Sequence, residues 1–138
     1  MPKTDLNRFH IAQSMSYDKA LGEIKNGIKT SHWMWYIFPQ LKSLGKSPTS
    51  QFYGISNLEE AKAYLDDEIL GPRLKEITNA LLNHSNKRIE TILGDIDSKK
   101  LKSSMTLFDI ISPNDVFQVA LETFFGGKRC KRTLIGRK

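Results

Sequence analysis

The sequence contains one cysteine, Cys130, and three histidines among 138 residues. A single thiol cannot form an intramolecular disulfide or supply a zinc site that needs several cysteines. The scattered histidines do not form the H-E-x-x-H pattern of a zinc enzyme, and no glycine-rich phosphate loop of the Walker or Rossmann type is present. We therefore expect no metal and no cofactor.

Long apolar runs are also missing. No uninterrupted stretch approaches the roughly 18 residues of a membrane-spanning helix. The start of the chain lacks the apolar segment of a secretory signal. Neither a repeat nor a low-complexity linker divides the chain. These absences, with the chain length, predict a single domain that is cytoplasmic and has no membrane partner.

The formal charge of +6 comes from one end of the chain. Residues 128–138 contain six basic residues and no acidic one. Removing these six from the 21 Lys and Arg leaves 15, which equals the 15 Asp and Glu. We therefore divide the chain into a formally neutral domain, residues 1–127, and a basic C-terminal tail, residues 128–138.

Apolar residues recur at spacings of three and four along most of the chain, which is typical of amphipathic helices. Helix-start signals support this reading: Ser56-Asn57-Leu58-Glu59 has the form of a capping box, and Ser112-Pro113-Asn114-Asp115 combines a cap with a first-turn proline. Patterns with a period of two are almost absent. The sequence predicts an all-α fold, a compact single-domain bundle of about six or seven short to medium helices.

Local signals predict where some elements begin and end. Asp5 and Ser16 each have the position of a cap for a separate short helix. Gly45 and Pro48 indicate a loop, and Ser98 is expected to open a longer helix.

The segment Ser31–Gln40 reads Ser-His-Trp-Met-Trp-Tyr-Ile-Phe-Pro-Gln and resembles the signature of domain-of-unknown-function family 1810. The similarity continues at Tyr53-Gly54-Ile55, at Lys102–Phe108 and at Thr133-Leu134, and it spans nearly the whole chain. This resemblance implies a mainly α-helical single domain and brings no established activity. The shared Thr133-Leu134 suggests that part of the tail docks on the domain. Cys130 departs from the family pattern, in which we expect an Asp.

The signature segment carries the first group of candidate site residues, His32, Trp33, Trp35 and Gln40. Indole faces stack on planar groups, and an imidazole titrates near neutral pH, so His32 is the catalytic candidate. The alternative is a buried aromatic segment whose N–H groups are satisfied within the protein.

The second group lies on a predicted helix and comprises Lys102, Ser104 and Thr106. Residues four apart share a helix face, and a cation beside hydroxyls suits a phosphate or a carboxylate. The alternative is a polar helix flank whose hydroxyls bond to the preceding turn. Tyr53 is expected at the edge of the same site.

The leading hypothesis is that the two groups converge on a pocket for a planar, anionic small molecule such as a nucleotide derivative. The protein would then be a small-molecule-binding protein or an enzyme. The first alternative is a module that binds nucleic acid or an acidic protein through the basic tail, because clustered cations attract phosphates. A further alternative is a structural or interaction protein. The sequence leaves the ligand, the reaction and the oligomeric state open.

Overall fold

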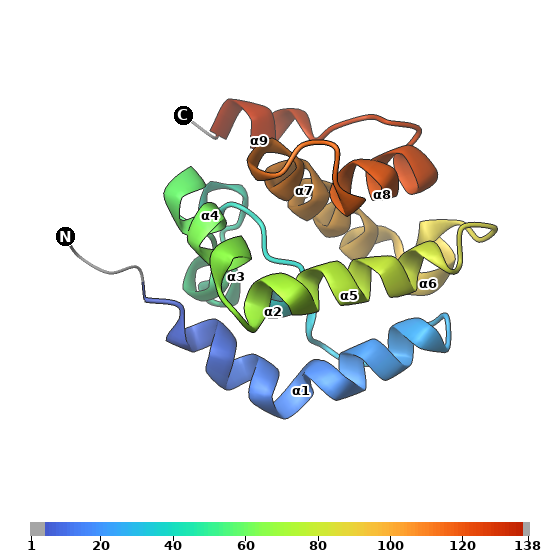
Figure 1. Ribbon diagram of the computed structural model, residues 1–138, viewed down its shortest axis with the longest axis horizontal. Coiled ribbons are helices and arrows are strands. Elements are labelled where there is room, and N and C mark those ends of the chain that lie inside the picture. Colours follow the sequence, from blue (N-terminus) through green and yellow to red (C-terminus); the bar gives the residue numbers. More distant parts are fainter. Residues whose placement is uncertain (1–4, 137–138) are drawn as a thin grey trace.

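The computed structural model describes residues 5–136, and this part of the chain contains helices and no strand (Figure 1). One isolated bridge joins Leu41 to Ile55. The helices are α1 (Asn7–Lys25), α2 (Met34–Ile37), the short 3-10 helix η1 (Lys42–Leu44), α3 (Pro48–Tyr53), α4 (Leu58–Asp66), α5 (Leu70–Leu82), α6 (Ile89–Leu93), α7 (Asp95–Ile111), α8 (Val116–Phe125) and α9 (Lys131–Gly136).

The all-α class is confirmed, and the expected number of six or seven helices is wrong, because residues 5–136 contain nine α-helices. One additional helix is α3, in the region expected to be a loop. Ser47 accepts a hydrogen bond from the backbone N–H of Ser50, and Pro48 occupies the first turn. Proline suits that position, since the first N–H groups of a helix have no partner within the helix. The proline that was interpreted as a loop signal therefore begins a helix.

Other boundaries also differ from the sequence expectation. Pro113, expected in the first turn of a helix, precedes α8, which begins at Val116 after the cap Asp115. The separate helices predicted from Asp5 and Ser16 form one continuous helix, α1. The long helix expected to begin after Ser98 begins at Asp95, directly after Gly94 with φ +85°. The Ser98 hydroxyl donates to the Gly94 carbonyl, so Ser98 lies inside the first turns of α7.

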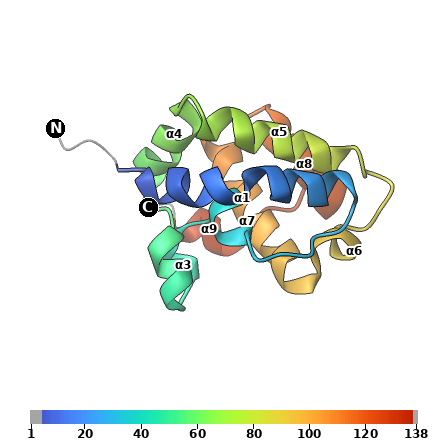
Figure 2. The same ribbon diagram turned by 90° about the horizontal axis from the view of Figure 1, so that it is seen from below.

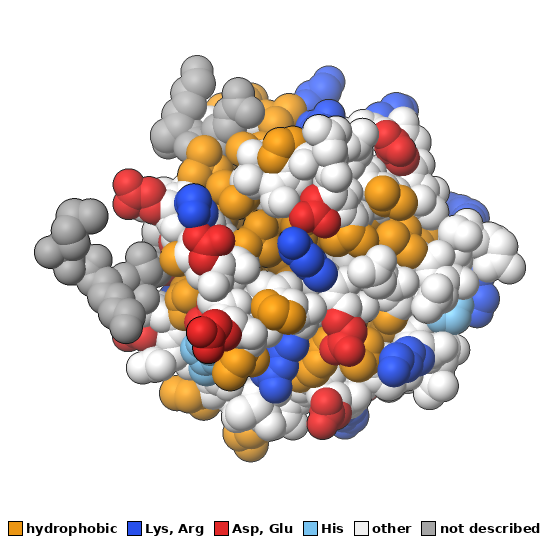
Figure 3. Space-filling view, in the orientation of Figure 1, with side chains coloured by type: hydrophobic (Ala, Val, Ile, Leu, Met, Phe, Trp, Pro, Cys, Tyr) orange, Lys and Arg blue, Asp and Glu red, His pale blue; other side chains and the backbone are white. Residues whose placement is uncertain are grey.

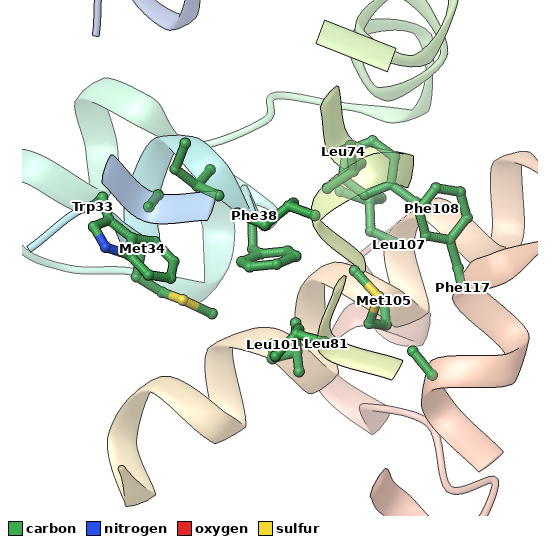
Figure 4. Close-up of a cluster of buried hydrophobic side chains, with 14 of the residues drawn as sticks. Trp33, Met34, Phe38, Leu74, Leu81, Leu101, Met105, Leu107, Phe108 and Phe117 are labelled. Atoms are coloured by element: carbon green, nitrogen blue, oxygen red, sulfur yellow. The ribbon is translucent and has the colours of Figure 1, made fainter. Parts of the chain in front are cut away.

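Helix α7 lies at the centre of the bundle. It packs against α4, α6, α8 and α9, while α1 and α5 run side by side below it (Figures 1 and 2). Nearly every residue from Leu101 to Asp109 is buried, so α7 has no wide solvent face along this part. Figure 4 shows Met105 and Phe108 of α7 in the core. They lie among Trp33 and Phe38 of the signature segment, Leu74 of α5 and Phe117 of α8.

The loop before α2 is held by one carboxylate oxygen. Glu23 Oε1 accepts hydrogen bonds from the backbone N–H groups of Thr30 (2.7 Å) and Ser31 (3.0 Å) and from the indole Nε1 of Trp33 (2.9 Å). Burial alone would raise the pKa of Glu23, but these hydrogen bonds outweigh it and lower the pKa to about 2. Glu23 thus fixes the buried Trp33 ring and the entry into α2.

The described part of the C-terminal tail folds back onto α7 (Figure 1). Helix α8 ends at Gly126 in the left-handed conformation, with φ +62°. Arg129 then forms an ion pair with the buried Asp109 on α7, with Nε 3.0 Å from Oδ2. The backbone N–H of Cys130 donates to the Thr106 hydroxyl (2.9 Å), and Thr133 is fully buried. Arg137 and Lys138 lie outside the described residues.

The face formed by α1, α4 and α5 carries acidic and basic side chains interspersed (Figure 3). Some of them contact one another: Arg8 forms an ion pair with Glu60 (3.0 Å), and His10 forms a hydrogen bond with Asp67 (2.8 Å). This pattern agrees with the formal neutrality of residues 1–127.

Glu23→Gln is expected to lower the free energy of unfolding at pH 7 by about 1–3 kcal/mol, because the charge-assisted hydrogen bonds weaken. The pKa of about 2 in the folded protein lies below the ordinary 4.5, so the contribution is present above pH 4.5 and is lost as the pH falls towards 2. Urea unfolding at several pH values measures the free energy of unfolding of the wild type and of the variant. The difference between wild type and variant should shrink in that window; a constant difference contradicts the assignment. Glu68→Gln, at an exposed position, is the matched control.

Arg129→Met is expected to destabilise the protein by about 2 kcal/mol, because the Asp109 carboxylate remains buried without a cation. The double variant Asp109→Asn/Arg129→Met should recover part of this loss. Trypsin should cleave the tail of the single variant faster, while Lys128→Met, at the neighbouring exposed position, should not change cleavage at α9. Unchanged stability and cleavage in Arg129→Met would show that the pair does not hold the tail.

Candidate anion-binding cleft

A cleft of about 350 Å³ lies where α2, η1, α3, α7 and α9 meet. The elements that line it come from three distant parts of the sequence, and the docked tail supplies one wall. Its lining residues are Trp35, Gln40, Leu44, Gly45, Lys46, Ser47, Ser50, Ile96, Lys99, Lys100, Ser103, Cys130 and Arg132.

The charge of this cleft has one sign. Lys46, Lys99, Lys100 and Arg132 line it, and none of its described lining residues is acidic. Lys100 forms an ion pair with Asp97 (3.1 Å), which in turn also pairs with Lys29 (2.8 Å). A hollow lined by cations concentrates the positive potential and attracts anions.

Lys100 also contacts the aromatic ring of the cleft. Its Nζ lies 4.0 Å from the centroid of Trp35, in the geometry of a cation–π contact. This contact places an ammonium group over one face of the indole, and only the other face is free of this lysine. The cleft therefore combines a cation and an indole at one end.

Neutral polar groups complete the lining. Gln40 is 9% exposed, and its backbone carbonyl accepts a hydrogen bond from the Ile55 N–H (2.9 Å). The Ser50 hydroxyl donates to the Ser47 carbonyl (2.8 Å), so this group is already used within α3. An amide offers both a donor and an acceptor, so Gln40 can bind a ligand that carries polar atoms at its edge.

Cys130 lies at the junction of α7 and α9. Burial raises the pKa of its thiol, but hydrogen bonds from Ser103, Thr133 and Arg132 outweigh burial, and the pKa lies below its ordinary value. Ser103 Oγ is 3.3 Å from the sulfur. A thiolate and a carboxylate both accept hydrogen bonds from backbone N–H groups at the start of a helix.

A second hollow, of about 640 Å³, adjoins the cleft. Cys130 and Arg132 belong to the lining of both, so the two spaces share a wall. The remaining lining residues of the second hollow are all basic: Lys102, Lys128, Arg129 and Lys131.

Comparison with known proteins places the chain in a family. A family model described as a protein of unknown function, DUF1810, matches residues 3–136. The chain belongs to the DUF1810 family. The resemblance of the signature segment is thereby confirmed.

A solved structure agrees with the fold of this DUF1810 protein. The conserved hypothetical protein Rv1873 from Mycobacterium tuberculosis is 45% identical, with a TM-score of 0.92 over 95% of this chain and 94% of the other. None of the curated proteins matches the chain. These relatives assign no activity, so the function has to be argued from the site.

Three of the residues proposed from the sequence lie at the two hollows. Trp35 and Gln40 line the cleft, and Lys102 lines the second hollow. The other proposed residues lie elsewhere: His32 is exposed and lines neither hollow, and Tyr53 packs against Tyr36 with ring centroids 5.2 Å apart.

Three further proposed residues are buried. The Trp33 indole donates to Glu23, and the Thr106 hydroxyl donates to the Lys102 carbonyl (2.8 Å) while it accepts from Cys130. Ser104 is fully buried, and its hydroxyl has no partner among the described residues. Trp33 and Thr106 thus hold together the elements that form the cleft.

Sequence reasoning missed the cations of the cleft itself, Lys46, Lys99, Lys100 and Arg132. A signal was present on α7, because Ile96, Lys99, Lys100 and Ser103 are spaced by three or four residues and share one face. That face could have been compared with the face of Lys102 and Thr106.

No group of three or more His, Cys, Asp or Glu side chains within residues 5–136 is arranged to hold a metal ion. Within the same residues, no helix has both the length and the apolar character needed to span a bilayer.

The Cys130 thiol is expected to ionise at a lower pH than the same thiol in the unfolded chain, because the folded protein supplies hydrogen bonds to the thiolate. The rate of alkylation by iodoacetamide as a function of pH measures this, and the single cysteine makes the signal specific. Ser103→Ala should move the midpoint upwards. A folded-state midpoint equal to or above that in urea would rule out the assigned hydrogen bonds.

Proposed function

We propose that this protein binds a small anionic molecule, one bearing a phosphate or a carboxylate, in the cleft between α2, η1, α3, α7 and α9. The observation that carries the proposal is the lining of one open cleft by Lys46, Lys99, Lys100 and Arg132, without an acidic residue among its described lining. The volume, about 350 Å³, lies in the range of small-molecule sites.

Trp35 and Gln40 support a ligand that also carries a planar polar group, as a nucleotide derivative does. An indole such as that of Trp35 stacks on planar rings, and the Gln40 amide can pair with polar atoms at the edge of such a ring. Ligand binding is the proposed role. We propose no catalytic role for His32, because it lines neither hollow.

Lys99→Gln is expected to weaken the binding of adenosine monophosphate by about fivefold to tenfold, because a cation of the cleft is lost. Lys19→Gln, an exposed lysine on α1, makes the same change of charge outside the cleft and should change the affinity less than about twofold. Isothermal titration calorimetry at low salt measures both.

The proposal fails if neither adenosine monophosphate nor inorganic phosphate binds. It also fails if Lys19→Gln weakens binding as much as Lys99→Gln, since the effect would then come from net charge alone.

A second candidate function is binding of nucleic acid through the tail. The observation that favours it is the exposure of Lys128 and Lys131 beside the second hollow. Such binding would extend over several phosphates and weaken steeply with salt. A structural or interaction role through the aromatic segment has less support, because Trp33, Met34, Ile37 and Phe38 are buried in the core.

A further inference from the structure

The two hollows differ in chemistry although they share a wall. The cleft holds an indole, an amide and hydroxyls together with its cations. The second hollow is lined only by basic residues and Cys130. Arg132 belongs to both, so a molecule that occupies both spaces passes a guanidinium group at the junction.

The backbone that carries the cations of the second hollow is held in place by the fold. Arg129 is committed to Asp109, the Cys130 backbone is bonded to Thr106, and Thr133 is buried. These contacts anchor the segment that carries Lys128 and Lys131 against α7, which carries Lys102. Because the backbone is already fixed, binding costs less conformational entropy here than it would for a free basic tail.

The lysines of the second hollow lack ion-pair partners among the described residues. Lys102, Lys128 and Lys131 form no ion pair with another residue of the described chain. Holding them side by side costs electrostatic energy, which an anion of high charge would offset.

We infer that the two hollows form one continuous site for a nucleotide that carries a chain of phosphates, such as a nucleoside di- or triphosphate. The planar base and the first phosphate occupy the cleft, where the indole and the amide lie. The further phosphates extend past Arg132 to Lys102, Lys128 and Lys131. This inference rests on the proposed function, because it extends the ligand of the same cleft.

The test compares two series of ligands by calorimetry at one salt concentration without added metal: adenosine mono-, di- and triphosphate, and phosphate, pyrophosphate and tripolyphosphate. The expected affinity rises about tenfold or more from the first to the last member of each series, as cations of the second hollow are engaged. The adenosine compound should bind more tightly than the inorganic anion with the same number of phosphates.

The variant Lys128→Gln/Lys131→Gln should flatten both series while the affinity for adenosine monophosphate changes less than about twofold. Lys19→Gln/Lys25→Gln, which removes two exposed lysines of α1, is the matched control and should retain the rise. Protection of the Cys130 thiol from alkylation gives an independent readout, because Cys130 lies on the shared wall.

A flat series with intact binding of the monophosphate would overturn this inference and leave the proposed function standing. Absence of binding for every ligand would overturn both. Equal affinity for tripolyphosphate and adenosine triphosphate would overturn the placement of the base in the cleft. Tighter binding of a single-stranded oligonucleotide, with affinity that increases with its length, would overturn the inference in favour of nucleic acid.

Discussion

The buried carboxylate of Asp109 determines where the C-terminal tail lies. A carboxylate on the central helix α7 is strongly unfavourable unless a cation reaches it, and Arg129 is that cation. Once Arg129 is placed, the next residues begin α9 and Thr133 enters the core. The described part of the basic tail thereby becomes a wall of the cleft. Removing the tail would leave Asp109 unpaired, so a truncation tests stability and binding together.

A second carboxylate has a corresponding role for the segment that leads into α2. Glu23 on α1 gathers the N–H groups of the loop before α2 and orients the Trp33 ring. Because Trp33 is fixed in the core, the short helix α2 presents Trp35 on its other side to the cleft. Glu23 thus positions the wall formed by α2, and Asp109 positions the wall formed by the tail. Neither carboxylate is among the residues that line the cleft.

The sequence alone predicted the fold class because helix periodicity is a local property that survives in almost every segment. It assigned Pro48 to a loop, because proline is common both in loops and in the first turn of a helix. The hydrogen bond that Ser47 accepts from the Ser50 N–H distinguishes the two cases. It identified Trp35 as a candidate for stacking on a planar group and Gln40 as a polar residue next to an apolar segment. It did not identify Lys99 and Lys100, because α7 is surrounded on several sides and its sequence does not say which face meets the tail.

The account centres on anion binding beside Trp35, and the amide and indole signals of a ¹⁵N-labelled protein test it most directly. The chain has two indole N–H groups: Trp33 donates to Glu23 inside the core, and Trp35 lines the cleft. Titration with pyrophosphate should shift the Trp35 indole and the Gln40 side-chain amide along one saturable curve, while the Trp33 indole stays in place. If neither the Trp35 nor the Gln40 signal moves, or if only signals of α1 and α4 move, the cleft is not an anion site and the account is wrong.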